Sequence, residues 1–385
     1  MKSIRKKIES AILSDDPPEM LGLETALNVM SAGYGLGVGL RGAAFDRNIV
    51  RTRCLPVKVL SIGNITVGGT GKTPMTVHVA QILKAMGRKV AVVSRGYRGD
   101  AERKGGIVHD GTKSLMTPHE AGDEPWMTGE TLKTVPVIVG QNRYVSGMLA
   151  KEKFDTEVII LDDGFQHRKL HRDVDIVLLD CLRPFGNGHL LPRGPLREDF
   201  SALLRTHAIV LTRSDIDPDF KKRSLNRLEK ITGNSIPVFT CLHRPRIIKI
   251  IRKGGLEETA DVIKNAENGQ AGWNEFLKNR PVYAFSGIAK NDDFLKSLKT
   301  SFQCHIAGFS AFPDHYAYTD LDIDALSGAA EKCRAKLMVT TEKDYVRLAG
   351  RISGLPVDLA VIGIDIAFVP DDIAFKEFLI KTLKI

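Results

Sequence analysis

Six runs rich in Val, Ile and Leu recur between residues 57 and 215, and they constrain the fold more than any other feature. Each run ends at turn-forming or charged residues, as strands buried on both faces of a parallel sheet do. The runs cover residues 57–64, 89–96, 135–140, 156–163, 174–180 and 207–215. Helical segments alternate with them, the first from Lys72 to about Met86. This alternation predicts a doubly wound, mostly parallel α/β sheet whose ligands bind at the carboxyl ends of its strands.

A change of pattern near residues 236–256 indicates a second, smaller part of the chain. This stretch is basic and rich in β-forming residues, and it is more typical of a connector than of another sheet repeat. Four further strand patterns follow at residues 280–289, 304–310, 335–344 and 357–366. A chain of 385 residues is long enough for two domains of ordinary size. We expect an N-terminal segment (1–50), a larger α/β domain (51–240) and a smaller α/β domain (241–385) that begins with the β-rich linker.

Charge and cysteine content limit the classes of function. The formal net charge of +9 is consistent with anionic partners, which include nucleic acid, lipid headgroups and phosphorylated substrates. No nucleic-acid-binding motif accompanies the charge, so nucleic acid ranks last among these partners. The five cysteines are scattered and never occur in C-x-x-C spacing. This argues against a disulfide framework and against a zinc site, and it favours a reducing compartment.

The N-terminal segment combines basic residues with an uncharged stretch over residues 26–40. The basic residues are Lys2, Arg5, Lys6 and Lys7 before the stretch and Arg41, Arg47, Arg51 and Arg53 after it. The stretch is too short and too rich in glycine for a membrane-spanning helix, and the basic residues after it do not suit a cleaved secretory signal. It is consistent with a helix that lies in an anionic membrane surface, and equally with a buried core helix.

The stretch SIGNITVGGTGKTP (61–74) lies between the first predicted strand and the first predicted helix, where a phosphate-binding loop is expected. Its three closely spaced glycines allow the backbone to curl so that several N–H groups face one point, and the helix amino terminus adds positive potential there. Lys72 can reach the β- and γ-phosphates, and the hydroxyl of Thr73 can bind Mg²⁺. Thr66 stands where the usual pattern has glycine, so the sequence predicts a variant phosphate loop.

The strand pattern EVIILDD ends in Asp162 and Asp163. In a parallel sheet these carboxylates come to the same edge as the phosphate loop, where an acid after a strand holds Mg²⁺ directly or through water. Many strands end in acids that only cap the next helix, so the pair gains its meaning from the combination with Lys72 and Thr73. Together these residues predict a site for a nucleoside triphosphate and Mg²⁺.

Two other classes of phosphate-loop protein lack a diagnostic residue in this chain. LTRSD (211–215) is similar to the guanine-specificity motif of GTPases, but Arg213 stands where lysine is expected. The loop also resembles that of ATPases with a signature lysine before the paired glycines, but that position holds Val67. Neither class is favoured, although a GTPase stays open as an alternative.

One family matches the whole run G-N-[IL]-T-x-G-G-[TN]-G-K-T-P that begins at Gly63. Further blocks follow in order over nearly the full chain: VVSRGYRG (92–99), AGDEP (121–125), DDGFQH (162–167), FGNGHLLPRGPLRE (185–198), FSGIA (285–289), FPDHYAYT (312–319) and TTEKD (340–344). Together they resemble the lipid A 4′-kinases, or tetraacyldisaccharide 4′-kinases, with RGYRG and GFQH as slight variants. The N-terminus is similar too, since members of the family attach to the cytoplasmic face of the inner membrane through an N-terminal helix.

The resemblance implies roles for individual residues. The ATP phosphate loop would consist of Thr66, Val67, Gly68, Gly69, Thr70, Gly71, Lys72 and Thr73. Asp123 would be the base that accepts the proton of the sugar hydroxyl, with His315 beside it, and Asp123 could also cap a helix. Arg197 would stabilise charge on the transferring phosphoryl group or bind the substrate's phosphate. The candidate ligands for Mg²⁺ besides Thr73 are Asp162, Asp163, Glu124 and Glu198.

The resemblance also implies the reaction and its setting. A kinase with this P-loop NTPase-type domain over residues 51–240 would use ATP and Mg²⁺ to phosphorylate the 4′-hydroxyl of a tetraacyl glucosamine disaccharide 1-phosphate, a step toward lipopolysaccharide. The expected location is the cytoplasmic face of the inner membrane of a Gram-negative-type bacterium. An anionic membrane surface is the expected partner, without nucleic acid or an obligate protein partner. Two alternatives stay open: a GTPase or metallochaperone-type nucleotide switch, and a non-catalytic nucleotide-binding protein at a membrane.

Overall fold

The computed structural model of the protein describes residues 21–215, 217–259, 276–278, 280–348, 350–352 and 354–385. The basic residues that precede the uncharged N-terminal stretch lie outside the described residues; they are Lys2, Arg5, Lys6 and Lys7. Contacts between residues group the described chain into two compact units. The first unit comprises the described residues up to Ala121, Thr128–His243 and Ile366–Ile385, and the second comprises Gly122–Met127 and Arg244–Asp365.

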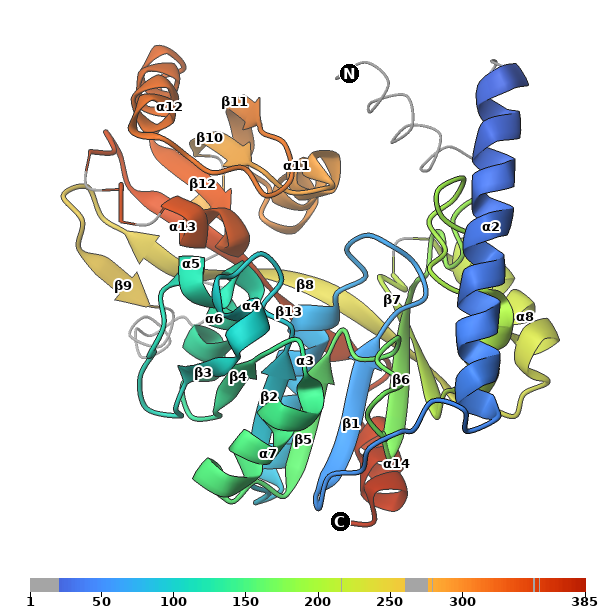
Figure 1. The fold of residues 1–385 in the computed structure, drawn as a ribbon. Helices are drawn as coiled ribbons and strands as arrows, with labels where there is room; N and C mark the ends of the chain where they lie inside the picture. Colours follow the sequence, from blue (N-terminus) through green and yellow to red (C-terminus); the bar gives the residue numbers. More distant parts are fainter. Residues whose placement is uncertain (1–20, 216, 260–275, 279, 349, 353) are drawn as a thin grey trace. The chain divides into compact units, whose positions relative to one another are not determined.

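The first unit is built around a sheet with the strand order β8-β7-β6-β1-β5-β2-β4-β3 (Figure 1). Its strands are β1 (Lys58–Gly63), β2 (Val90–Ser94), β3 (Gly106–His109), β4 (Val137–Val139), β5 (Val158–Asp162), β6 (Val174–Asp180), β7 (Ala208–Thr212) and the first part of β8 (Val238–Ile251). Neighbouring strands pair in parallel, except β3 with β4, which pair antiparallel. The predicted mostly parallel sheet is therefore confirmed.

The six predicted strands of this unit correspond to β1, β2, β4, β5, β6 and β7, and the β-rich stretch 236–256 contains β8. The sequence did not predict β3. That strand has only four residues, of which two are partly buried, so it offers no continuous apolar run. The buried strands β5, β6 and β7 carry such runs over their whole length, which is why their sequences identified them.

Seven α-helices and one 3₁₀ helix of the described chain lie wholly in the first unit. They are α2 (Leu21–Asp46), α3 (Lys72–Ala85), α4 (Ala101–Lys104), α5 (Pro118–Ala121), α7 (Arg143–Phe154), α8 (Pro218–Thr232), α14 (Ile373–Leu383) and the 3₁₀ helix η1 (Phe200–Arg205). α3 begins at Lys72, as predicted, and it buries Met75, Val79 and Leu83 at helical spacing.

The end of the chain belongs to the first unit. The sequence pattern grouped residues 241–385 together, whereas contacts place Ile366–Ile385 with the larger sheet. The ring of Phe239 in β8 lies 5.2 Å from that of Phe375 and 5.5 Å from that of Phe378, centroid to centroid. Such burial of aromatic surface decides where the last helix packs, and no local pattern reports it.

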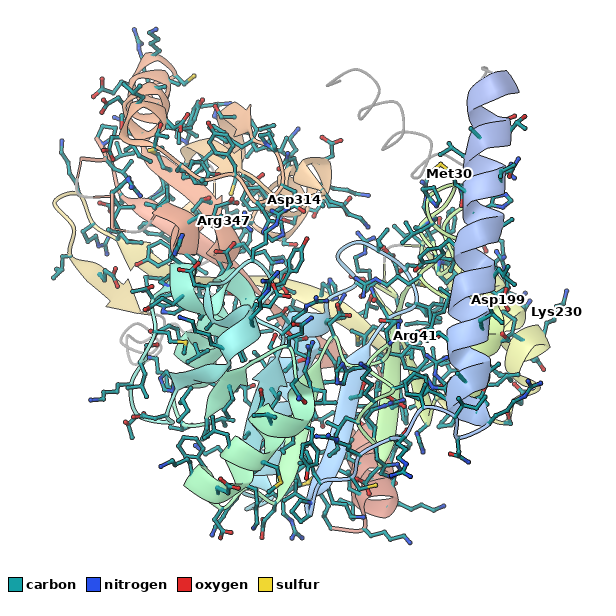
Figure 2. All side chains as sticks on the ribbon, in the orientation of Figure 1. Met30, Arg41, Asp199, Lys230, Asp314 and Arg347 are labelled. Atoms are coloured by element: carbon teal, nitrogen blue, oxygen red, sulfur yellow. The ribbon has the colours of Figure 1, made fainter. Side chains whose placement is uncertain are left out.

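Helix α2 packs one side against loops of the first unit. The hydroxyl of Ser31 donates to the carbonyl oxygen of Leu190 (2.9 Å), and that of Tyr34 donates to the carbonyl oxygen of Arg197 (3.0 Å). The other side exposes large apolar side chains: Val29, Met30, Leu36 and Leu40 are each 60–68% exposed. Met30 is labelled beside this helix in Figure 2. α2 is therefore only partly a core helix. Over the residues that the structure describes, no helix has the combined length and hydropathy that crossing a membrane requires.

The second unit has its own sheet, with the strand order β11-β10-β12-β13-β8 and with β9 paired antiparallel to β8. Its elements are the second part of β8, β9 (Glu257–Thr259), β10 (Pro281–Ser286), α11 (Asn291–Ser301), β11 (His305–Ala311), α12 (Asp320–Lys332), β12 (Leu337–Thr341), α13 (Glu342–Leu348), most of β13 (Leu359–Phe368) and the beginning of α6 (Asp123–Leu132). β10 to β13 are the four strands predicted from the sequence, and their pairing is parallel. The predicted second α/β pattern is thus present.

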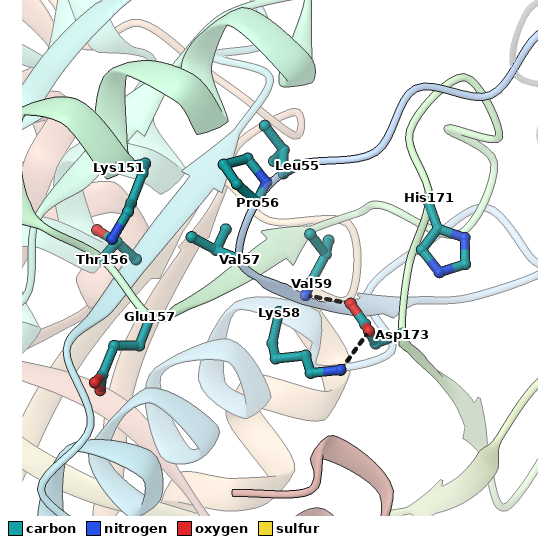
Figure 3. A pocket seen from close by; sticks show the side chains of 10 residues that line it. All are labelled: Leu55, Pro56, Val57, Lys58, Val59, Lys151, Thr156, Glu157, His171 and Asp173. Carbon is teal, nitrogen blue, oxygen red and sulfur yellow. Dashed lines mark hydrogen bonds and ion pairs between the residues drawn. The ribbon is translucent and has the colours of Figure 1, made fainter.

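A hollow of about 470 Å³ opens at the amino ends of β1 and β5 (Figure 3). Within it, Lys58 forms an ion pair with Asp173 (3.0 Å), which also accepts a hydrogen bond from the backbone N–H of Val59 (2.9 Å). These charged groups already pair with one another. The hollow lies at the opposite ends of the strands from the predicted phosphate loop, so it is not the candidate active site.

Candidate active site

The predicted phosphate loop lies between β1 and α3, as expected. Gly71, the residue before the helix, has a left-handed backbone (φ 87°, ψ 26°), which favours glycine. A Cβ atom there would lie 2.5 Å from Nε2 of His243, so any larger residue would also have to displace that ring. The N–H of Arg197 donates to the carbonyl oxygen of Ile65 (2.7 Å). These contacts keep the glycine-rich loop curled at the amino terminus of α3, the geometry that phosphate binding uses.

Thr66, the departure from the usual pattern, has a structural explanation. It is buried and forms an antiparallel β-bridge with Leu196. The extended backbone of such a bridge is open to any residue, so this position does not need glycine. Gly68 and Gly69 form the exposed part of the loop, while the side chain of Asn64 donates to the hydroxyl of Thr70 (3.1 Å). The variant loop is thus held from both sides.

Lys72, Asp163 and Arg197 form a charged cluster in the first unit. Nζ of Lys72 lies 3.6 Å from Oδ1 of Asp163, and one guanidinium nitrogen of Arg197 donates to both carboxylate oxygens (3.0 Å each). Burial raises the pKa of Asp163, but the charges of Lys72 and Arg197 outweigh it and hold the pKa below its usual value. The carboxylate is therefore ionised beside two cations, which suits a site for phosphate groups.

Two of the other predicted metal ligands in this unit have polar partners. Asp162, buried at the end of β5, accepts a hydrogen bond from the hydroxyl of Thr76 (3.2 Å). Glu198 accepts from Arg205 (2.8 Å) and from the side chain of Gln166 (3.0 Å). Among the described residues, no three His, Cys, Asp or Glu side chains gather into a set that could hold a metal ion. Such a donor set needs phosphate oxygens and water to complete the shell of Mg²⁺.

Sequence reasoning gave no role to Arg143, which begins α7 at the carboxyl end of β4. Burial is the largest cause that lowers the pKa of Arg143, to about 10, and the positive charge of Arg95 is the second. The charges of Asp163 and Asp162 act in the opposite direction. Arg143 therefore adds a further cation to the surroundings of the two aspartates. Its position three residues after a predicted strand was the signal in the sequence that could have identified it.

Asp123 and His315 lie together in the second unit, as the family resemblance implied. Nδ1 of His315 is 3.5 Å from Oδ2 of Asp123, and Asp123 is the first residue of α6. Burial raises the pKa of Asp123, but the hydrogen bond and the positive charge of Arg347 oppose it, and the pKa lies below its usual value. Glu124, next to Asp123, pairs with Lys343. Arg347 (Figure 2) is a member of this cluster that the sequence analysis missed.

A profile of the tetraacyldisaccharide-1-P 4′-kinase family matches residues 23–384 of the chain. The chain belongs to this family. It is 38% identical over 388 residues to the tetraacyldisaccharide 4′-kinase of Desulfatibacillum aliphaticivorans, covering 100% of both chains. It is 36% identical to that of Syntrophus aciditrophicus (strain SB), covering 93% of this chain and 92% of the relative. A crystal structure of LpxK from Aquifex aeolicus in complex with ATP has a TM-score of 0.71 at 30% identity, covering 94% of this chain and 99% of that chain.

Membership in the tetraacyldisaccharide-1-P 4′-kinase family makes the chain a kinase, and the GTPase alternative is not favoured. The position of Arg213 agrees with this conclusion. Nε of Arg213 donates to Oδ1 of Asp180 (3.2 Å), and a second guanidinium nitrogen pairs with Oδ2 of the same residue. The residue that replaces the expected lysine of a guanine-specificity motif thus follows β7 directly and forms an ion pair with the last residue of β6.

Proposed function

We propose that this kinase transfers the γ-phosphoryl group of ATP to the 4′-hydroxyl of a tetraacyl glucosamine disaccharide 1-phosphate, which yields a lipid A precursor. The observation that carries the proposal is the family match over residues 23–384. The chain also keeps the parts that this chemistry requires: a phosphate loop with Lys72, and a carboxylate with a neighbouring histidine at Asp123 and His315.

Different residues have different roles in the phosphoryl transfer. Residues 66–73 hold the triphosphate through backbone N–H groups, and Lys72 and Arg197 balance its charge. Asp123 accepts the proton of the 4′-hydroxyl while that oxygen forms a bond to the γ-phosphorus. The bond from the γ-phosphorus to the bridging oxygen breaks, and ADP leaves with the electron pair. Phosphoryl transfer needs alignment and charge neutralisation more than covalent participation of the protein, and these residues supply both.

Mg²⁺ fits the oxygen donors that the chain presents at the ends of β5 and α3. Asp162 is the last residue of β5 and Asp163 follows it, and the hydroxyl of Thr73 lies in the first turn of α3. One or two carboxylates plus phosphate oxygens and water are the usual environment of this ion. Glu198 and Glu124 belong to other segments, where they pair with Arg205 and Lys343, so Thr73, Asp162 and Asp163 are the first choices. Bound there, Mg²⁺ would neutralise charge on the phosphates.

Transfer of label tests this function directly. The purified protein is incubated with γ-labelled ATP and the disaccharide 1-phosphate lipid, and we expect label in the lipid. A lipid that already carries a 4′-phosphate serves as the control and should stay unlabelled. Nucleotide binding without labelled lipid would overturn the proposal in favour of a non-catalytic nucleotide-binding protein, and a preference for GTP would support a nucleotide switch.

We also propose that the kinase works at the cytoplasmic face of the inner membrane of a Gram-negative-type bacterium. Two features support contact with an anionic surface. α2 exposes apolar side chains, and exposed arginines lie near its carboxyl end and in the residues that follow it. These arginines are Arg41, Arg47, Arg51 and Arg53. The five free cysteines and the need for ATP support the cytoplasmic side.

Replacing Leu36 and Leu40 together with glutamine should weaken membrane contact without unfolding α2, since both side chains are largely exposed. Loss of their burial in lipid removes together about 2 kcal/mol, or more than about tenfold in liposome affinity. Flotation with anionic liposomes measures this, and KM for the lipid should rise more than KM for ATP. The matched control is Leu321→Gln, since Leu321 is 79% exposed in α12. Equal flotation of all three proteins would place the membrane contact elsewhere, for example in the loop around residues 185–194.

A further inference from the structure

We propose that Arg347 is the positioning residue of this kinase: it orients the carboxylate of Asp123 and keeps the proton of His315 on Nε2. The inference rests on the proposed function, because Asp123 is the base in that reaction. No role was assigned to this arginine from the sequence. It lies in α13, three residues after the last residue of the TTEKD block.

Contacts within the protein fix the position of the Arg347 side chain. Its side chain is only 5% exposed. One terminal nitrogen donates to the carbonyl oxygen of Gly287 (2.9 Å) and lies 3.4 Å from Oδ1 of Asp344, whose side chain is fully buried. Asp344 in turn accepts from the hydroxyl of Tyr318 (3.1 Å) and from the N–H of Gly287 (3.0 Å). The guanidinium is therefore anchored on one side before it meets Asp123 and His315 on the other.

The remaining nitrogens of Arg347 decide how the predicted pair is arranged. Nε donates to Oδ2 of Asp123 at 2.7 Å, and the second terminal nitrogen lies 3.1 Å from Nδ1 of His315. A guanidinium has only donors, so Nδ1 must be the acceptor and the neutral ring must carry its proton on Nε2. Nδ1 cannot at the same time donate to Asp123, and its distance to Oδ2 is longer, at 3.5 Å. Arg347, and not His315, thus makes the close contact with the carboxylate.

This arrangement determines which carboxylate oxygen of Asp123 accepts the proton in the reaction. Arg347 and His315 both lie against Oδ2 of Asp123. Among the described residues, Oδ1 is then the oxygen of that carboxylate left to receive the proton of a substrate hydroxyl. A base whose orientation is set by a second residue needs less reorganisation at the moment of transfer, which is the usual contribution of a positioning group.

Three segments that the sequence analysis singled out meet at this arginine. Gly287 in FSGIA accepts from Arg347 and from the backbone N–H of His315 (3.2 Å). A Cβ atom at Gly287 would lie 3.1 Å from both Oδ1 of Asp344 and the carbonyl oxygen of Pro313, closer than neighbours tolerate easily. His315 has a left-handed backbone (φ 60°), which is uncommon outside glycine, and its bond to Gly287 supports it. FSGIA, FPDHYAYT and TTEKD thus build one support around the arginine.

The test compares Arg347→Met and Arg347→Lys with Arg351→Met in the full-length protein. Arg351 is the matched control, because it is an exposed arginine of the same unit that pairs with Asp320 at the surface (2.9 Å). We expect Arg347→Met to lower kcat for lipid phosphorylation by at least about tenfold and to change KM for ATP by less than about twofold. A lysine side chain can reach Asp123 but cannot hydrogen-bond Asp123 and His315 at the same time, so Arg347→Lys should have a kcat between those of Arg347→Met and the wild type. Arg351→Met should match the wild type.

A spectroscopic measurement separates this role from a merely structural one. In ¹⁵N-histidine-labelled wild-type protein, Nδ1 of His315 should give the signal of an unprotonated ring nitrogen and Nε2 that of a protonated one. Arg347→Met and Arg347→Lys should both show a mixture of tautomers. If Arg347→Met does not fold, Arg347→Lys alone carries both tests.

Two outcomes would overturn the proposal. One is a folded Arg347→Met protein whose kcat stays within about twofold of the wild type, and the other is an unchanged His315 signal in either variant. The same holds for an equal loss of kcat in Arg351→Met. These outcomes differ from failure of the proposed function, in which the wild-type protein itself leaves the lipid unlabelled while the signal of His315 can still be measured.

Discussion

Replacing Lys72 with alanine is expected to lower kcat by about two to three orders of magnitude, because the lysine stabilises charge on the transferring phosphoryl group. The melting temperature of the nucleotide-free protein should hardly change. Among the described residues, the ion pair of Lys72 is the one with Asp163 at 3.6 Å, and Asp163 keeps two hydrogen bonds from Arg197 at 3.0 Å when the lysine is removed. Steady-state kinetics with the lipid substrate and thermal unfolding without nucleotide measure the two effects.

Lys84→Ala is the matched control for this substitution. Lys84 lies in the last turn of the same helix, is exposed, and donates only a long hydrogen bond to the carbonyl oxygen of Thr134 (3.4 Å). Its replacement should leave both kcat and the melting temperature unchanged. A large fall in the melting temperature of Lys72→Ala without nucleotide would instead make Lys72 a structural residue of the loop.

Asp123→Asn should lower kcat by about 10²- to 10⁴-fold, the range typical of losing a general base, with little change in KM for ATP. Asparagine keeps the size of the side chain and can still accept a hydrogen bond from Arg347, so a loss of activity would report the missing negative charge and basicity. Asp320→Asn is the control, since Asp320 forms a surface ion pair with Arg351 in the same unit. A folded Asp123→Asn protein with nearly normal kcat would exclude Asp123 as the base.

Combining Asp123→Asn with His315→Ala tests whether the two residues act as a unit. They lie 3.5 Å apart and share the contact with Arg347, so the effects of their replacement should be clearly non-additive. The double variant should lose little more activity than Asp123→Asn alone. Strictly additive losses in the logarithm of kcat would mean that the histidine works independently of the carboxylate.

The phosphate loop and its surroundings could be predicted because their signals are local. A continuous apolar run forms β1, closely spaced glycines follow, and Lys72 begins α3, so a stretch of 14 residues contains the whole pattern. Asp162 ends β5 and Asp163 follows it, and β5 neighbours β1 in parallel register with Ile62 opposite Asp162. The carboxyl ends of parallel strands meet at one edge, and this rule brings the aspartates near Lys72 without any knowledge of distant contacts.

Other features depended on packing that no local pattern reports. Thr66 looked like a defect of the loop until its β-bridge with Leu196 explained it. α2 could have been a core helix or a surface helix, and only the exposure of residues such as Met30 and Leu36 distinguishes them. The last helix, α14, packs on Phe239 of the larger sheet because aromatic surface is buried there.

The sequence by itself determined the kind of fold, the phosphate loop and the family, since periodicity, glycine spacing and rare residue blocks are all readable along the chain. The support of Asp123 was decided only by tertiary structure. Asp123 and Arg347 are 224 positions apart, and no periodicity relates them. Arg347 is placed by the parallel pairing of β10 and β12, because Gly287, directly after β10, and α13, directly after β12, emerge at the same edge of the sheet and bond there. The sequence blocks supply His315, Gly287 and Asp344, but only the hydrogen-bond donors and acceptors fixed at that edge place Arg347 against the carboxylate.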